Sequence, residues 1–296
     1  METNGFNIIP EYFQKAALLH FSPSQLNLPI DVWLHKYIFK NKEWRDQQIL
    51  HPRVPAGSAA EKGFLHYILE EEDQGAAVKV ARTEFKKNKV YYVSHWNADY
   101  EKCLDTLEKV VANAIAGFRE IGEVKNCTTQ EDCEFHFKGI DVTCQGKTDI
   151  LTSKYVIELK TKWRKPGTPC KVTKRTPDGM TSGIVGSLPK TSPPIENLKQ
   201  VSFYSKATGK EPIIIYANDI GHRVFDKNNC NKMTPSFMEH YIEFLRINQK
   251  VRQNFLKIST NPRVLAQYIQ PDFSDYRWND LNEEEFEEAV GLWKNI

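Results

Sequence analysis

Two short stretches constrain the fold of this chain more than any other: GKTDI at residues 146–150 and VIELK at residues 156–160. Both are typical of β-strands. Strand side chains alternate between two faces, so Glu158 and Lys160 project to one side and the intervening apolar residues project into a core. With Asp149, the strands then present two carboxylates and one ammonium at one place. Such a group can hold a divalent metal ion and activate water against a phosphodiester.

The composition fits a globular chain without a membrane span. Of 296 residues, 40% are hydrophobic and 26% are charged, which are ordinary values for a globular protein. The formal net charge is only +2, so any contact with nucleic acid must come from local basic patches. No run of about 18 apolar residues exists, and the N-terminus lacks the pattern of a secretory signal. We therefore expect a cytoplasmic protein.

Six cysteines occur without any CxxC pair, which argues against a zinc-ribbon site. We expect them to be reduced thiols, as is usual in cytosolic proteins. They are Cys103, Cys127, Cys133, Cys144, Cys170 and Cys230.

The region before the acidic strands contains several helix signals. Residues 16–40 carry apolar residues near helical period after a cap at Ser22 or Ser24. The stretch 52–57 contains two prolines and a glycine and is expected to be a loop. The stretch 58–61, SAAE, is a capping-box pattern that predicts the start of a helix there.

Further along, residues 78–98 alternate and are rich in β-branched and aromatic residues, which predicts a hairpin or short edge strands turning at 86–89. Residues 100–120 are an amphipathic helix with apolar residues every three to four positions. At least three consecutive strands are expected over residues 135–163, followed by a helix at 195–208 and a buried strand at 212–217.

The segment 164–194 interrupts this pattern. It is rich in Lys, Pro, Thr, Ser and Gly and has no convincing period. A loop of this length inside a compact domain is usually functional or disordered. Its basic residues favour a flap that tracks phosphates, and the alternative is a solvated surface loop.

The chain after residue 225 is mostly helical, with helices expected at 236–258, near 261–269 and at the acidic tail. We expect aromatic residues to pack the tail back onto the rest of the chain. They are Phe273, Tyr276, Trp278 and Trp293.

The motifs occur in a defined order: Gly146-x-x-Asp149, then Glu158-x-Lys160 in an apolar strand, then a helix carrying Gln200-x-x-x-Tyr204. In this combination the chain resembles the RecB-like branch of the PD-(D/E)XK nuclease superfamily, in the form common among phage-type exonucleases. The resemblance covers roughly residues 20–220. It includes SPSQL at 22–26 and the helix with Gly63 and His66, which are separated by one residue fewer than is usual in the family.

The resemblance implies a metal site. Asp149 and Glu158 would be carboxylate ligands of Mg²⁺ or Mn²⁺, and the backbone carbonyl of Leu159 would be a further oxygen ligand. His66 would be an additional ligand from the preceding helix. No iron–sulfur cluster is expected, because the family's cluster needs one cysteine before the core and three after it, whereas only Cys170 and Cys230 follow Lys160.

It also implies roles for other residues. Lys160 would orient the attacking water or stabilise charge on the phosphate, and Gln200 and Tyr204 would support the site or contact the DNA backbone near the scissile phosphate. A set of basic residues beyond the third strand would guide the DNA strand toward the metal ions: Lys162, Arg164, Lys165, Lys174 and Arg175.

The expected fold is therefore α/β, with a restriction-endonuclease-like mixed central sheet flanked by helices and a helical C-terminal extension. We expect a nuclease core with N-terminal helices at 1–225 and a helical region at 226–296 packed on it. The resemblance implies a Mg²⁺-dependent DNA exonuclease of phage replication or recombination, or of host DNA degradation, working in the bacterial host cytoplasm. The implied partners are DNA and a phage single-strand-binding or annealing protein, with the oligomeric state open.

Three other interpretations remain open. The same site would suit a structure-specific or restriction-type endonuclease. The chain could also be a non-catalytic nucleic-acid-binding module of the same fold, although a module without turnover would tolerate loss of Asp149, Glu158 or Lys160. A non-nuclease α/β protein with chance acids would bind no metal.

Overall fold

The structure is a computed structural model that describes residues 9–40, 42–47, 51–70, 73–87, 96–122, 126–163 and 187–294. The chain divides into two compact units. One comprises Met1–Gln48, Cys133–Gly146 and Glu239–Ile296, and the other comprises Ile49–Asp132 and Lys147–Met238. This grouping differs from the expected division between residues 1–225 and 226–296, because the first 48 residues group with the C-terminal helices.

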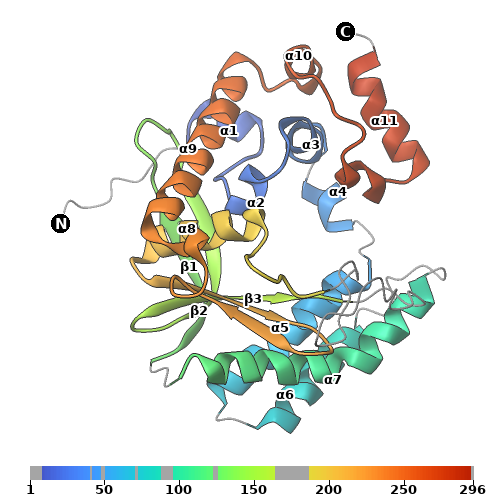
Figure 1. Cartoon of the computed structure of the whole chain (residues 1–296). Coiled ribbons are helices and arrows are strands. Elements are labelled where there is room, and N and C mark those ends of the chain that lie inside the picture. The colour runs from blue at the N-terminus through green and yellow to red at the C-terminus, as the bar shows by residue number, and fades with distance from the viewer. Residues whose placement is uncertain are drawn as a thin grey trace. The chain divides into compact units, whose positions relative to one another are not determined.

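The larger unit, Ile49–Asp132 with Lys147–Met238, contains the main part of a mixed five-stranded sheet (Figure 1). The strands lie in the order β1-β2-β3-β4-β5. Their bounds are β1 Thr128–Phe135, β2 Cys144–Leu151, β3 Tyr155–Thr161, β4 Glu211–Ala217 and β5 His222–Phe225. Two of the strands expected over 135–163 are confirmed as β2 and β3, and the strand expected at 212–217 is confirmed as β4. The expected first strand is wrong, because β1 ends at Phe135 and residues 136–143 form no strand.

The register of the sheet follows from alternating apolar residues. β2 and β3 are antiparallel and pair Ile150 with Ile157, both of which are fully buried. β3 and β4 are parallel, and β4 and β5 are antiparallel. The parallel pair is joined through a helix, as a parallel connection requires. The apolar face of β3 therefore points into a core, as the strand pattern predicted.

Four helices of this unit flank the sheet on both sides (Figure 1). Three pack against each other and lie on one side of it, and the fourth lies on the other side against β3 and β4. Their bounds are α5 Arg53–Leu69, α6 Gln74–Lys87, α7 Asn97–Glu120 and, on the other side, α8 Ile195–Thr208, with a short 3-10 helix, η4 Asn231–Met233, after β5. The helices expected at 100–120 and 195–208 are confirmed. The second ends at Gly209, whose φ of 69° is favourable only for glycine.

Two expectations about the region before the sheet are wrong. Residues 78–87 are helical in α6 and do not form the first strand of a hairpin. Ala77, Ala81 and Phe85 recur every four residues and are fully buried, so tertiary packing selects the helical period over the alternating one. The rest of that expected hairpin, residues 88–95, lies outside the described residues.

The start of α5 also differs from expectation. The helix begins at Arg53, so Ser58 lies inside it and is not its cap, and residues 53–57 are not a loop. Pro55 is tolerated because it lies in the first turn, where backbone N–H groups have no intrahelical partner. The earlier start adds helix length beside β3, where a side chain at Gly57 would contact the Thr161 hydroxyl.

Gly63 has a packing role. A Cβ atom at this position would lie 2.5 Å from the carbonyl oxygen of Ala77 and 2.8 Å from the Cβ atom of Ala81. Only glycine permits this close approach of α5 and α6 without a backbone shift. The glycine of the family-like Gly63/His66 motif therefore serves contact between helices.

The smaller unit is mainly helical, including the helical C-terminal region. The N-terminal segment expected to form one helix near 16–40 is instead divided at Pro29, because proline cannot continue the hydrogen-bonding pattern of a helix. Its N-terminal helices are α1 Glu11–Lys15, α2 Pro23–Leu26, α3 Ile30–Trp33, the π-helix η1 Leu34–Phe39 and α4 Lys42–Gln47. Its C-terminal helices are α9 Pro235–Ile258, α10 Pro262–Ala266, η5 Tyr276–Asp280 and α11 Glu283–Lys294.

Ser22 caps α2, as expected, by accepting a hydrogen bond from the amide of Gln25. No helix in the described part of the chain has the length and apolar character that crossing a membrane requires. The five cysteines that the structure describes are free thiols.

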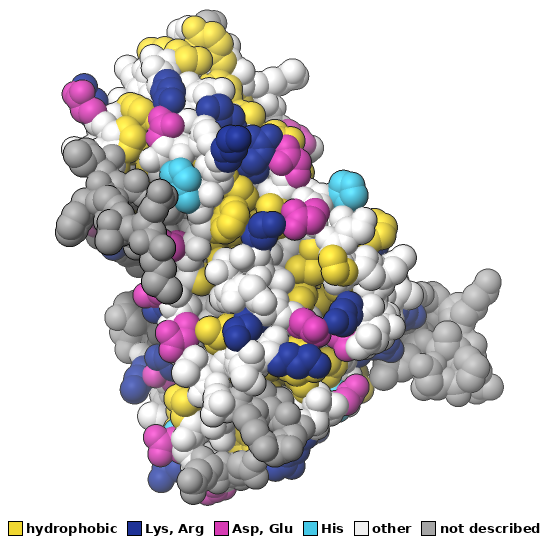
Figure 2. All heavy atoms as spheres, turned by 90° about the vertical axis from the view of Figure 1, so that its left-hand side faces the viewer, with side chains coloured by type: hydrophobic (Ala, Val, Ile, Leu, Met, Phe, Trp, Pro, Cys, Tyr) yellow, Lys and Arg dark blue, Asp and Glu magenta, His cyan; other side chains and the backbone are white. Residues whose placement is uncertain are grey.

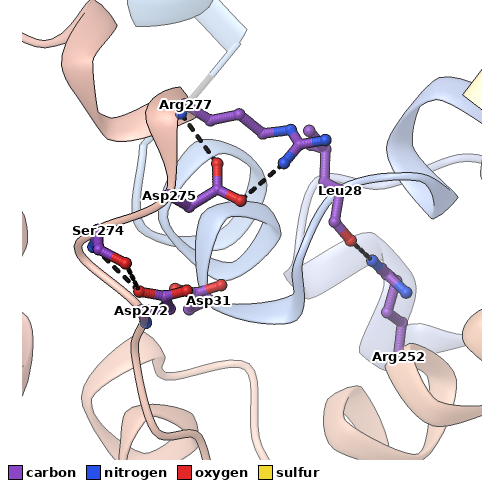
Figure 3. Close-up of polar contacts among 7 residues, drawn as sticks. All are labelled: Leu28, Asp31, Arg252, Asp272, Ser274, Asp275 and Arg277. Carbon is purple, nitrogen blue, oxygen red and sulfur yellow. Dashed lines mark hydrogen bonds and ion pairs between the residues drawn. The ribbon is translucent and has the colours of Figure 1, made fainter.

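Contacts between distant segments hold the smaller unit together (Figure 3). Arg252 of α9 is fully buried and donates a 2.6 Å hydrogen bond to the Leu28 carbonyl, and the Asp31 carboxylate accepts a bond from the Asp272 amide. Asp275 caps η5 through the amide and guanidinium of Arg277. The aromatic packing of the tail is confirmed for Phe273, Trp278 and Trp293, whereas Tyr276 is exposed.

His35 makes the stability of the smaller unit depend on pH. It is fully buried among the rings of Phe39, Trp44 and Trp278, and neither ring nitrogen has a hydrogen-bond partner in the described structure. Burial, reinforced by Lys40, lowers the pKa of His35 to about 4 from 6.5. Between pH 4 and pH 6.5, His35 therefore binds a proton in the unfolded chain but not in the folded chain.

Stability contributed by neutral His35 is present above pH 6.5 and is lost as the pH falls toward 4. We expect this loss to reach about 3 kcal/mol, at 1.36 kcal/mol per pKa unit. His35→Phe should flatten the dependence. Urea unfolding followed by tryptophan fluorescence at pH 7 and pH 4.5 measures the difference, and equal losses in both proteins would contradict this origin.

Candidate active site

Asp149 and Glu158 lie on the neighbouring strands β2 and β3 of the larger unit. The antiparallel register that pairs Ile150 with Ile157 places these two acids opposite each other one step along. Both are buried. The Asp149 Oδ2 atom accepts a 2.7 Å hydrogen bond from the amide of Leu159, which holds the carboxylate against β3.

Glu158 is only 2% exposed and has two different oxygen environments. Its Oε1 atom lies 2.5 Å from the ammonium of Lys160, which is on the same face of β3. Its Oε2 atom is buried without a hydrogen-bond partner in the part of the chain that the structure describes. An unpaired buried carboxylate oxygen is costly, so this atom is suited to a cationic ligand.

A third carboxylate comes from α5. Glu61 interacts electrostatically with both Glu158 and Asp149, and its Oε1 atom accepts a 2.7 Å hydrogen bond from the side-chain amide of Gln130. Gln130 has a φ of 56°, a left-handed conformation that is uncommon for a residue with a side chain. Backbone strain of this kind is typically kept where the surroundings require it. In this chain the residue with the strained backbone, Gln130, is the one whose side chain holds Glu61.

Burial and neighbouring charges shift the pKa values of Asp149, Glu61 and Lys160. Burial raises the pKa of Asp149 well above its ordinary value, and the negative charges of Glu158 and Glu61 add to this rise. Burial and the charge of Glu158 likewise raise the pKa of Glu61. Burial alone would lower the pKa of Lys160, but the carboxylates of Glu158 and Asp149 outweigh it and raise the value. Lys160 therefore stays protonated, while the carboxylates of Asp149 and Glu61 are destabilised as anions.

The structure places His66 elsewhere. It follows Glu61 by five positions on α5, which corresponds to about 140° around the helix axis. His66 instead lines a hollow with residues of α6, among them Lys79, Thr83 and Glu84. The expected histidine ligand therefore does not lie near the acids. The α5 side chain that interacts with them is Glu61.

The two expected supporting residues on α8, Gln200 and Tyr204, contact each other. The Gln200 side-chain amide donates a 2.8 Å hydrogen bond to the Tyr204 hydroxyl, so the two share a helix face, as their spacing predicted. On the same helix, Asn197 donates a hydrogen bond to the hydroxyl of Tyr216 in β4.

Of the expected DNA-contacting residues, Lys162 is described. It is half-buried with its ammonium 5.9 Å from the centroid of the Tyr216 ring. Burial, together with the charge of Lys160, lowers the pKa of Lys162. Four other expected contacts lie outside the described residues: Arg164, Lys165, Lys174 and Arg175.

The residues present fit a hard divalent cation. Their donor set is carboxylate oxygen, as Mg²⁺ prefers. A cation would satisfy the unpaired Glu158 oxygen and relieve the mutual repulsion of the three acids. Within the described ranges, no three His, Cys, Asp or Glu side chains form a ready-made metal-binding group. One oxygen of Asp149 is directed to a backbone amide and one of Glu158 to Lys160.

Sequence reasoning did not select Glu61 or Gln130. Glu61 matched a capping-box pattern, which is correct only if the helix begins near Ser58, and α5 begins at Arg53. Once that start is known, Glu61 becomes an interior residue with no capping role. Gln130 has no sequence signal of its own, since its function depends on the contact with Glu61, 69 positions away.

No protein-family model matches the chain, and no curated protein matches it. A solved structure, described as the crystal structure of SSO0001, is similar over 52% of this chain and 68% of its own chain, with 15% sequence identity and a TM-score of 0.25. A similarity at this TM-score does not support a fold or a function.

Proposed function

We propose that the larger unit is a metal-dependent DNA nuclease with a restriction-endonuclease-like fold. The observation that carries this proposal is the unpaired Oε2 atom of Glu158 beside Asp149, Glu61 and Lys160. Asp149 and Glu158 are buried and Glu61 is half-buried, with a single lysine among them, and like charges destabilise each other at low dielectric, so a bound cation would offset their repulsion. The mixed sheet with helices on both sides is consistent with the proposed fold.

Asp149, Glu158 and Glu61 would hold Mg²⁺ or Mn²⁺, together with the backbone carbonyl of Leu159. When bound, the ion supplies positive charge next to the phosphate and lowers the pKa of a coordinated water. The hydrogen bond from the Leu159 amide fixes the orientation of Asp149, and Gln130 fixes that of Glu61. The protein's contribution at this point is to hold its oxygen ligands before substrate arrives.

Lys160 supplies a permanent positive charge at the same place. It stays protonated because Glu158 and Asp149 raise its pKa, and its side chain is partly exposed while Glu158 is buried. A protonated amine in this position can hold the attacking water or stabilise charge that develops on the phosphate oxygens. Gln200 and Tyr204 would steady the neighbouring helix or contact the DNA backbone.

Exonuclease action in phage replication or recombination, inside the host cytoplasm and beside a phage single-strand-binding or annealing protein, is the setting we propose from the resemblance. The test is digestion of end-labelled linear DNA and closed circular DNA with Mg²⁺ or with EDTA. We expect metal-dependent loss of linear DNA alone. Cutting of circles would favour an endonuclease, and the absence of any metal-dependent cutting would exclude both enzymes and leave a binding module.

Substitutions of the two candidate ligands on α5, Glu61 and His66, are expected to have different effects on cleavage. Glu61→Gln keeps the size and the hydrogen-bonding capacity of the side chain but removes its charge, and we expect cleavage to fall by about 10- to 100-fold, as for loss of a residue that supports a metal site. His66→Gln should leave cleavage within about twofold, because His66 faces α6. Initial rates over a Mg²⁺ titration compare them. A large loss in His66→Gln with little loss in Glu61→Gln would reverse the assignment.

A further inference from the structure

A row of residues crosses three strands of the sheet, starting at the candidate active site. Lys160 of β3 pairs in register with Tyr216 of β4, and Tyr216 pairs with Arg223 of β5. Directly paired residues on neighbouring strands project to the same face of a sheet. Lys160 and Arg223 therefore lie on one face, two strands apart, which corresponds to about 10 Å at about 4.8 Å per strand.

Positive charge follows this row at the surface. Tyr216 is fully buried, and the ammonium of Lys162 lies over its ring. Three cations follow the row: Lys160 is partly exposed, Lys162 is half-buried and Arg223 is exposed. Two acids accompany them, because Glu158 pairs with Lys160 and Glu196 interacts with Lys162. Figure 2 shows that basic and acidic side chains intermingle over the face of the molecule that it presents.

The row ends at a hollow of about 550 Å³ at β5. Exposed hydrogen-bond donors line it: Lys190, Thr191 and Arg223, beside Asn229. The Nη1 atom of Arg223 donates a 2.8 Å hydrogen bond to the Lys190 carbonyl, which anchors the guanidinium at the rim. A guanidinium has five N–H donors in a fixed plane, so the others remain for a ligand. Planar donors of this kind match phosphate oxygens.

One acid also lines the hollow. Glu120 of α7 lies there with its carboxylate 2.9 Å from the Nε2 atom of His222. Its charge opposes an anion, and the pairing with His222 draws the carboxylate toward β5. The hollow therefore holds two permanent cations, Lys190 and Arg223, against one acid that already has a partner.

We propose that this hollow binds a backbone phosphate of the nucleic-acid strand whose scissile phosphate lies at Glu158 and Lys160. This inference rests on the proposed function, because it takes the strand to run from that site. A separation of about 10 Å corresponds to about three phosphates, at about 3.4 Å of axial rise per nucleotide in one strand of B-form DNA. Arg223 and Lys190 would then hold the strand at a fixed distance from the cut.

The test measures binding without cleavage. Fluorescence anisotropy in EDTA, with labelled single-stranded and duplex oligonucleotides over a salt series, compares the wild type with Arg223→Ala. We expect Kd to rise by about tenfold. The slope of log K against log salt should become shallower by about 0.7 for single strands or 0.9 for duplex. Arg223→Lys should keep the slope, since it keeps the charge, and Glu120→Gln should tighten binding.

Lys232→Ala is the matched control, because Lys232 is an exposed cation of the same unit that does not line the hollow. It should change neither Kd nor the slope. Equal binding by Arg223→Ala and wild type, or no oligonucleotide binding by the wild type, would overturn the inference. Metal-dependent cleavage by the wild type is measured separately. If the wild type cleaves DNA but Arg223→Ala binds as tightly as the wild type, the hollow is not a phosphate site and the nuclease proposal stands. If Arg223→Ala weakens binding but the wild type cleaves no DNA, the nuclease proposal fails and the hollow still binds phosphate.

Discussion

Glu158→Gln is expected to reduce metal-dependent DNA cleavage by at least about 100-fold while the protein stays folded. The substitution removes the charge of the carboxylate whose Oε2 atom is unpaired, and a metal ion contributes several kcal/mol to stabilising such a transition state. Gln keeps the size of the side chain and an oxygen that Lys160 can still contact. Initial rates on end-labelled linear DNA at saturating Mg²⁺ measure the loss.

Glu211→Gln is a suitable comparison, because Glu211 lies on the neighbouring strand β4 and pairs with Lys227 at the surface. It should cleave DNA at nearly the wild-type rate. Circular dichroism and the thermal unfolding midpoint should be similar for all three proteins. If Glu158→Gln keeps more than about a tenth of the wild-type rate, this carboxylate is not a ligand.

Asp149→Asn is expected to lose activity and, without metal, to gain stability at high pH. Burial, Glu158 and Glu61 raise the pKa of Asp149 in the folded protein above its ordinary value of 3.8. The folded state therefore holds a proton more tightly than the unfolded state. Stability from this group is present below pH 3.8 and is lost as the pH rises through the raised pKa. Asn cannot ionise and can still accept the hydrogen bond from Leu159.

In EDTA at pH 8 we expect the variant to unfold a few degrees above the wild type, since about 1 kcal/mol shifts the midpoint by about 2–4 °C in a protein of 150–250 residues. The difference should vanish as the pH falls toward 4. Mg²⁺ at about 100 times its Kd should stabilise the wild type by about 2.7 kcal/mol and the variant by much less.

Differential scanning fluorimetry over pH 4–8, with EDTA or Mg²⁺, provides both comparisons. Asp105→Asn serves as a control, because Asp105 is exposed on α7. Asp105→Asn should respond to Mg²⁺ as the wild type does. If Asp149→Asn instead unfolds at a lower temperature than the wild type by the same amount at every pH, the carboxylate stabilises the fold as an anion. That result would count against a cation site.

Local patterns were sufficient for much of the larger unit. The alternation of VIELK predicted a strand with Glu158 and Lys160 on one face, and the structure has that strand and a direct contact between the two side chains. The apolar period of 100–120 predicted α7, and the spacing of Gln200 and Tyr204 predicted their shared face. Each of these features depends on residues within a few positions of each other.

Other features depended on contacts that no local pattern contains. The stretch VKVARTEF suits either a strand or a helix, and packing against Gly63 of α5 selects the helix. The grouping of residues 1–48 with 239–296 depends on bonds such as Arg252 to the Leu28 carbonyl. Periodicity describes one element at a time, so it does not report such pairings.

The sequence by itself determined that Asp149, Glu158 and Lys160 meet on adjacent strands, because side-chain alternation and antiparallel pairing are local properties of the backbone. Only the tertiary structure decided which residue of α5 joins them. The start of α5 at Arg53 and its position beside β3 turn Glu61 toward the acids and His66 toward α6. Five positions on a helix separate those two side chains by about 140°, so the packing of one helix decides the third ligand.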